Sequence, residues 1–193
     1  MDDSVTNFSV KTLEIGGLGA ALQALRLPYG KEVRSKVESA TVFFDKDVLS
    51  YDKISYRTTV GLDEKDKKLL QTLIKRGDEH SKVLRGVMVW FEVNAPRYYH
   101  LEMDTYRIGA ERLGSESTMH IQGHGLSTEE LVRMKAALPE GTMQKRIWMV
   151  SYQTLRRIYF QRRNHRLPQW QEFCKWIETL PFAKEFITIE NND

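Results

Sequence analysis

The sequence lacks three things: a second cysteine, a long apolar run and an even spread of charge. Cys174 is the only cysteine among 193 residues, so an intrachain disulfide is impossible and a reducing compartment is favoured. No apolar run approaches the length of about 18 residues that a membrane span needs. The start, Met1–Ser4, lacks the basic and apolar regions of a signal peptide. Together these absences predict a soluble, cytoplasmic protein without a membrane partner.

Acidic residues are missing from one long segment of the chain. None lies between Glu140 and Glu172, and seven basic residues do. Removing these seven charges from the formal net charge of +3 leaves −4 for the rest of the chain. Residues 141–171 are therefore predicted to bind an anion, with a nucleotide phosphate as the leading candidate. The seven residues are Lys145, Arg146, Arg156, Arg157, Arg162, Arg163 and Arg166.

The environment of Cys174 is apolar, in the stretch Phe173-Cys174-Lys175-Trp176-Ile177. Thiolate chemistry requires an accessible, electropositive site, which this stretch does not offer. A buried structural cysteine is expected.

The composition is that of a globular protein, with 41% hydrophobic and 28% charged residues, and it contains neither repeats nor low-complexity linkers. Strands and helices do not alternate regularly. This favours an α+β fold in which one domain, residues 1–193, has an antiparallel sheet flanked by helices. The predicted strands are Phe8–Ile15, Val37–Phe44 and Val87–Val93. The predicted helices begin at Asp63, Pro96, Ser127, Lys145 and Gln169, and 108–114 is expected to be a loop.

The segment from Lys145 to about Arg166 contains no Gly or Pro and is predicted to be one long helix. On such a helix, Arg156 and Arg163 lie seven residues apart, as do Tyr152 and Tyr159, so the four share a sector. Arginine forks suit phosphate, and tyrosine rings suit stacking on a base or flavin. The alternative is an ordinary solvated basic face. Binding of DNA or RNA by this face is disfavoured by the negative charge of the remaining chain.

Two further groups of residues are candidates for a site. Asp104–Arg107 and the hydroxyl-rich stretch Ser115–His120 offer donors for a phosphate, although such stretches are also typical of plain hydrophilic loops. Glu116, His120 and His124 have the spacing of helical metal ligands. Glycines around His124 argue against a helix there, so no metal site is expected.

Several motifs, in their order and spacing, resemble those of the flavin-dependent, or complementing, thymidylate synthases. Arg107 lies eleven residues past Pro96, where that family ends an Arg-His-Arg triplet, and Ser115 follows after seven more residues. Gln169-Trp170 stands where the family has Gln-Trp, six residues after the substrate-binding arginine that corresponds to Arg163. The resemblance covers roughly residues 63 to 175.

The resemblance implies an α+β homotetramer that has its sites at subunit interfaces. It also implies FAD as cofactor, with NADPH and methylenetetrahydrofolate as co-substrates in the methylation of dUMP. Arg107 would face flavin and nucleotide as a catalytic residue, Ser115 would contact dUMP, and Arg163 would bind dUMP. Lys135 would keep the charge of a family arginine. By their position, Arg156 and Tyr159 would join the nucleotide site, and Tyr106 would stack on a ring of the cofactor.

The chain departs from the family pattern on the side that faces the flavin. Thr105 and Tyr106 replace the first two members of the triplet, and Ser151 and Gln153 replace an asparagine and an arginine that help to hold the flavin. Two hypotheses follow. The first is a flavin-dependent enzyme that transfers a methyl or hydroxymethyl group to C5 of dUMP. The second is a catalytically inactive relative, such as a phage or bacterial regulator, that binds or sequesters a nucleotide.

Overall fold

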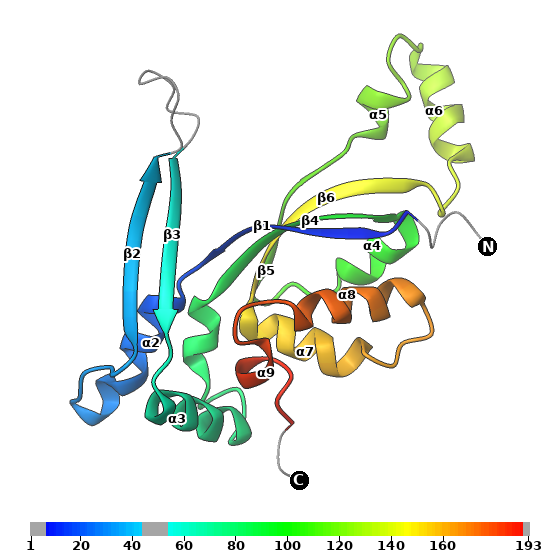
Figure 1. Cartoon of the computed structure of the whole chain (residues 1–193). Helices are drawn as coiled ribbons and strands as arrows, with labels where there is room; N and C mark the ends of the chain where they lie inside the picture. The colour runs from blue at the N-terminus through cyan, green and yellow to red at the C-terminus, as the bar shows by residue number, and fades with distance from the viewer. Residues whose placement is uncertain (1–6, 44–53, 191–193) are drawn as a thin grey trace.

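A four-stranded antiparallel sheet in the order β1-β4-β6-β5 forms the centre of the molecule (Figure 1). The structure is a computed structural model that describes residues 7–43 and 54–190. The sheet brings the beginning of the chain beside its middle, because Ser9 pairs with Asn94. The strands are β1 (Ser9–Gly16), β4 (Met88–Pro96), β6 (Met143–Ser151) and β5 (Ala110–Ser115).

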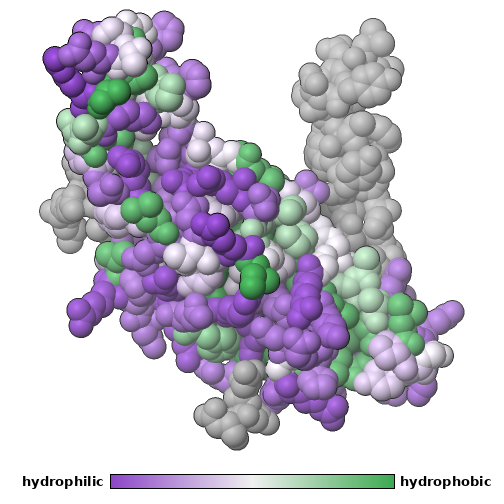
Figure 2. All heavy atoms as spheres, turned by 180° about the vertical axis from the view of Figure 1, so that it is seen from behind, coloured by the Kyte–Doolittle hydropathy of each residue, from purple (hydrophilic) through white to green (hydrophobic). Residues whose placement is uncertain are grey.

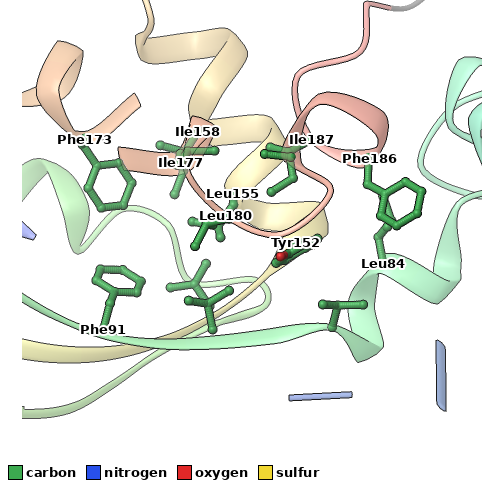
Figure 3. Close-up of a cluster of buried hydrophobic side chains, with 14 of the residues drawn as sticks. Leu84, Phe91, Tyr152, Leu155, Ile158, Phe173, Ile177, Leu180, Phe186 and Ile187 are labelled. Carbon is green, nitrogen blue, oxygen red and sulfur yellow. The ribbon is translucent and has the colours of Figure 1, made fainter. Parts of the chain in front are cut away.

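One face of this sheet is buried under helices. Alternate residues of β4, from Val89 to Ala95, have no exposed surface, as expected for a strand with one face in the core. Helices α4 (Arg97–Met103), α7 (Tyr152–Arg162) and α8 (Pro168–Glu178) cover that face (Figure 1). Phe91 of the sheet points towards Phe173 of α8, and their ring centroids are 5.6 Å apart (Figure 3). The α+β prediction is confirmed.

The rest of the described chain surrounds this core. A separate two-stranded ribbon, β2 (Lys36–Phe43) and β3 (Ile54–Gly61), stands beside α2 (Leu18–Arg26) and α3 (Glu64–Lys75). Two 3-10 turns, η1 (Leu27–Tyr29) and η3 (Lys82–Gly86), and the short helix α9 (Ala183–Phe186) complete the body. Helices α5 (Thr118–Ile121) and α6 (Thr128–Ala137) form an arm that projects from the sheet (Figure 1). Seen from behind, the arm carries both hydrophilic and hydrophobic residues (Figure 2).

Several local predictions hold. Asp63 caps α3 by accepting hydrogen bonds from two backbone N–H groups, and the Ser127–Glu130 capping box starts α6. The predicted strand at Val37 corresponds to β2, while its last residue, Phe44, lies outside the described residues.

The single long helix predicted from Lys145 is wrong. Residues 143–151 form β6, and α7 begins only at Tyr152 because the Ser151 hydroxyl accepts the N–H of Thr154. The signal for the strand is a two-residue alternation, in which Trp148 and Val150 are buried while Ile147 and Met149 are half-buried. Tyr152, Arg156 and Tyr159 lie on this shorter helix, and Arg163 is the C-cap residue that follows it.

The loop predicted for residues 108–114 is also wrong in part. Ala110–Ser115 is the edge strand β5, which pairs with β6, and Arg112 lies opposite Trp148. The residues of β5 are mostly exposed, so neither apolar alternation nor β-propensity marks the strand in the sequence. Pairing with β6 determines this structure.

Candidate functional site

Three adjoining hollows surround the loop from Asp104 to Gly109, which joins α4 to β5. The first, the arginine hollow, has a volume of about 280 Å³. The second, the tryptophan hollow, measures about 380 Å³ and shares Tyr106 and Arg107 with the first. The third, the helix-start hollow, measures about 370 Å³ and shares Ile108 and Arg157 with the first. The three hollows therefore adjoin one another around the loop, so that one extended ligand could occupy more than one of them.

The arginine hollow is lined by residues of the loop and of α7. Arg107 is exposed, and neither it nor Arg157 has a carboxylate partner among the described residues. The other two hollows each include two acidic residues, so the arginine hollow is the one of the three whose lining carries only positive charge. Its lining residues are Thr105, Tyr106, Arg107, Ile108, Arg157 and Gln161.

The tryptophan hollow combines aromatic and charged groups. Trp148 is 3% exposed, and its indole Nε1 has no hydrogen-bond partner among the described residues. Arg112 lies in the wall, but its Nη1 donates to Asp104 Oδ1 at 3.1 Å, and Arg146 donates to the other oxygen at 2.8 Å. Arg107 is therefore the arginine of this hollow that is not engaged by Asp104.

His100 lies buried behind this wall. Its Nε2 lies 2.8 Å from the carbonyl of Gln144, which can only accept, so Nε2 carries the proton. Burial lowers the pKa of His100 to about 4. The Gln144 hydrogen bond and Asp104 oppose this effect, and the cations Arg146 and Arg112 reinforce it. Asp104 and Arg112 of the hollow's lining therefore lie near a histidine that stays neutral at physiological pH.

The helix-start hollow lies at the beginning of α7. Gly109 has φ 73°, and a Cβ there would come within 2.5 Å of Thr154 Oγ1, so only glycine permits this approach. Gln153 accepts from Arg85 Nε at 2.7 Å and donates to the Asp78 carbonyl at 3.0 Å. Ser151 caps the helix. Ser151 and Gln153 thus have their polar groups engaged within the protein.

Tyr106 lines two hollows but is held in place by its hydroxyl. That group donates to Gln161 Oε1 at 3.0 Å and accepts from Arg162 Nε at 2.7 Å. Arg162 also donates to Glu102 at 2.5 Å and lies over the Trp170 ring at 4.6 Å. Tyr106 is therefore a fixed wall of the site. In the sequence Arg162 is only one of seven basic residues and Gln161 carries no signal, because their partners are distant along the chain.

Arg156, predicted to bind nucleotide, is instead buried, with 6% of its surface exposed. Its Nη1 donates to the carbonyls of Ile187 at 2.7 Å and Ile189 at 2.5 Å. These contacts fasten the end of the described chain to α7, and contact of Arg156 with a nucleotide stays a prediction.

Arg163 and Tyr159 lie in the same region. Arg163 donates to Glu190 at 2.6 Å and lies over the Phe160 ring at 4.9 Å. The Tyr159 hydroxyl donates to Glu178 at 2.8 Å. We call Arg156, Tyr159, Arg163 and their partners the C-terminal clamp. A phosphate could bind Arg163 only in place of, or beside, the Glu190 carboxylate.

Ser115 and Lys135 belong to a third region. Ser115 ends β5 and is exposed, and Lys135 donates to the Thr118 hydroxyl within the arm. Figure 1 shows the arm at the end of the molecule remote from α9. Within one chain, the predicted nucleotide and cofactor residues therefore fall into separate groups. Of these residues, Arg107 and Tyr106 lie together at the loop of residues 104–109.

Other candidate chemistry finds little support in the structure. Within residues 7–43 and 54–190, no three His, Cys, Asp or Glu side chains are grouped as metal ligands. In the same residues, no helix combines the length and apolar character of a membrane span. Cys174 is buried, which raises the pKa of its thiol to about 12, in keeping with the structural role expected for it.

Comparison with known proteins identifies the class of fold. No protein-family model and no curated protein sequence matches the chain. Among solved structures, the arrangement is similar to that of a flavin-dependent thymidylate synthase. Two crystal structures of ThyX from Helicobacter pylori, each with FAD and dUMP, match with a TM-score of 0.61. They are 17% and 16% identical, and the matches cover 92% and 93% of this chain and 97% and 96% of theirs. The likeness is one of fold over nearly the whole chain.

Proposed function

We propose that this protein binds a nucleotide in the hollows around residues 104–109. The observation that carries this proposal is the pairing of Arg107 with aromatic walls. Arg107 is exposed, has no carboxylate partner in the described chain and lines the tryptophan hollow together with Tyr106 and Trp148. A cation beside planar apolar surfaces is the combination that a nucleotide requires. The likeness in fold to a protein that holds FAD and dUMP supports the same class of ligand.

A second candidate function is flavin-dependent transfer of a methyl group to C5 of dUMP. The fold favours it, and it would require FAD, with NADPH and methylenetetrahydrofolate as co-substrates. The internal engagement of Ser151 and Gln153 weighs against flavin binding at those positions. We therefore place nucleotide binding without flavin chemistry first and derive no catalytic step.

A homo-oligomer, such as a homotetramer, forms part of the proposal. Ser115 and Lys135 are candidates for nucleotide contact, yet neither lines any of the three hollows, and the arm that carries Lys135 projects away from the sheet (Figure 1). In an oligomer, the arm of another copy could bring its Lys135 to a nucleotide bound at residues 104–109. Size-exclusion chromatography with light scattering measures the assembly directly.

Two measurements on the purified protein test these functions. An absorption spectrum between 300 and 500 nm and quenching of FAD fluorescence report flavin binding, while calorimetry with dUMP, dTMP, CMP and AMP reports nucleotide binding. A colourless protein that binds a mononucleotide supports the first candidate. A yellow protein that forms dTMP with NADPH and methylenetetrahydrofolate supports the second. A protein that binds neither flavin nor any of the four nucleotides contradicts both.

A further inference from the structure

The arginine hollow differs from its two neighbours in charge. Asp104 and Glu111 line the tryptophan hollow, and Asp78 and Glu79 line the helix-start hollow. The arginine hollow has two guanidinium groups and no carboxylate in its lining. Because like charges in one small space repel, this arrangement is unfavourable unless an anion balances it.

Arg157 is held by neutral partners. Its Nη2 donates to the Ile108 carbonyl at 2.9 Å and, less favourably, to Thr154 Oγ1 at 3.3 Å. Its Nε is buried and has no partner among the described residues. These contacts fix the guanidinium plane but leave its charge without a counter-ion in the described chain. A fixed, uncompensated fork is suited to bidentate contact with an oxyanion.

Gln161 adds a donor on the same wall. Its Oε1 accepts from the Tyr106 hydroxyl, which orients the amide and leaves both hydrogens of Nε2 free of any partner in the described chain. Thr105 completes the wall, although its hydroxyl already donates to the Glu102 carbonyl at 2.7 Å. The donors facing this space thus come from two arginines and one amide.

We infer that the arginine hollow is a phosphate subsite, in which Arg157 and Gln161 of α7 together with Arg107 hold a phosphate or diphosphate group. Its volume of about 280 Å³ suits such a group better than a whole cofactor. Two cations favour a doubly charged phosphate over a single carboxylate. This subsite rests on the proposed function for the identity of the remaining part of the ligand. The phosphate of the nucleotide lies in the arginine hollow, and its ring lies beyond Arg107 in the tryptophan hollow.

Calorimetry with three ligands tests this subsite: dUMP, deoxyuridine and inorganic pyrophosphate. Replacing Arg157 by Met removes the fork and should weaken dUMP binding about 30-fold, with deoxyuridine within about twofold of its original affinity. Gln161→Glu keeps the acceptor for Tyr106 and places a negative charge in the hollow, so it should weaken dUMP and pyrophosphate about tenfold without disturbing the fold. Arg133→Met, on the exposed arm, is the matched control and should change nothing, because its contact is an ion pair with Glu129.

The outcomes separate this inference from the proposed function. If the unaltered protein binds dUMP and both α7 variants bind it equally well, the phosphate subsite is wrong and nucleotide binding stands. If the protein binds pyrophosphate, loses it in both α7 variants and binds no nucleotide, the subsite stands and the proposed function falls. If it binds none of the three ligands, both are rejected. Circular dichroism melting of each variant identifies any loss that comes from unfolding.

Discussion

Two groups of arginines on and around helix α7 differ in what surrounds them. In the C-terminal clamp, Arg163 meets Glu190 and Arg156 meets two backbone carbonyls. At the loop of residues 104–109, Arg107 and Arg157 meet no carboxylate in the described chain. Of these four arginines, all except Arg107 lie in the segment 141–171, which contains no acidic residue. In the folded chain, however, acidic residues from other segments, such as Glu190, pair with arginines of this segment. Absence of acids in sequence therefore locates basic residues, while the fold decides which of them remain available to a ligand.

Mutations in the C-terminal clamp should lower the free energy of unfolding, most strongly at Arg156. Arg156→Met removes charged donors from two carbonyls in an interior position, each such bond contributing about 1.5 to 3 kcal/mol. We expect the free energy of unfolding to fall by about 3 kcal/mol. Urea unfolding measures it, with the exposed Arg166→Met as the control. An unchanged unfolding curve would show that the contacts of Arg156 do not stabilise the fold.

The free energy of unfolding should depend on pH through the buried His100. His100 takes up a proton near pH 6.5 in the unfolded chain, whereas burial lowers its folded pKa to about 4. Its contribution to stability is therefore full above about pH 6.5 and is lost as the pH falls towards 4, by about 3 kcal/mol in all. Unfolding free energies from pH 7 to pH 4 should decline less steeply for His100→Gln. Parallel pH profiles for the two proteins would show that His100 does not titrate as described.

Mutation of Arg107 in the loop should change the affinity for the ligand. Arg107→Ala removes an exposed cation that contacts no other described residue through a hydrogen bond or ion pair. We therefore expect dUMP affinity to fall about tenfold, equivalent to about 1.4 kcal/mol, while stability changes by less than about 0.5 kcal/mol. Calorimetry and thermal melting on one preparation give both quantities. A large loss of stability would mean that Arg107 supports the loop instead of the ligand.

The smallest effect is expected at the surface pair of the clamp. The Arg163 and Glu190 side chains are 37% and 65% exposed, and exposed ion pairs contribute about 0 to 1 kcal/mol. Arg163→Met should therefore lower the free energy of unfolding by less than about 1 kcal/mol and should lose its effect in high salt. Melting temperatures at low and high salt test this. A salt-independent loss would indicate that packing on Phe160, instead of charge, governs the contact.

The sequence predicts features that depend on neighbouring residues better than those that depend on distant ones. The Asp63 cap, the Ser127 capping box and the buried Cys174 are local or compositional, and the structure contains them. The absence of Gly and Pro predicts a helix from Lys145, and this signal masks the two-residue alternation of strand β6. Strand β5 has no apolar pattern to detect.

The site shows the same limit. The distance from Pro96 identifies Arg107 in the sequence, whereas Arg157 is there only one of seven basic residues and Gln161 carries no signal. Only the fold places these two opposite the loop. Helical spacing predicts a ligand contact for Arg156, because it does not reveal that the carbonyls of Ile187 and Ile189 accept from its guanidinium. Contacts between residues about 30 to 50 positions apart, such as Arg157 with Ile108, cannot be derived from local pattern alone.

Parallel dUMP titrations of Arg107→Ala and Arg163→Met test the comparison of the two arginine groups most directly. We expect about a tenfold loss of affinity for Arg107→Ala and less than about a twofold change for Arg163→Met. The reverse result, with Arg163→Met losing affinity and Arg107→Ala retaining it, would contradict a nucleotide site at residues 104–109. It would place the nucleotide at the C-terminal clamp, where Glu190 would have to give way to a phosphate.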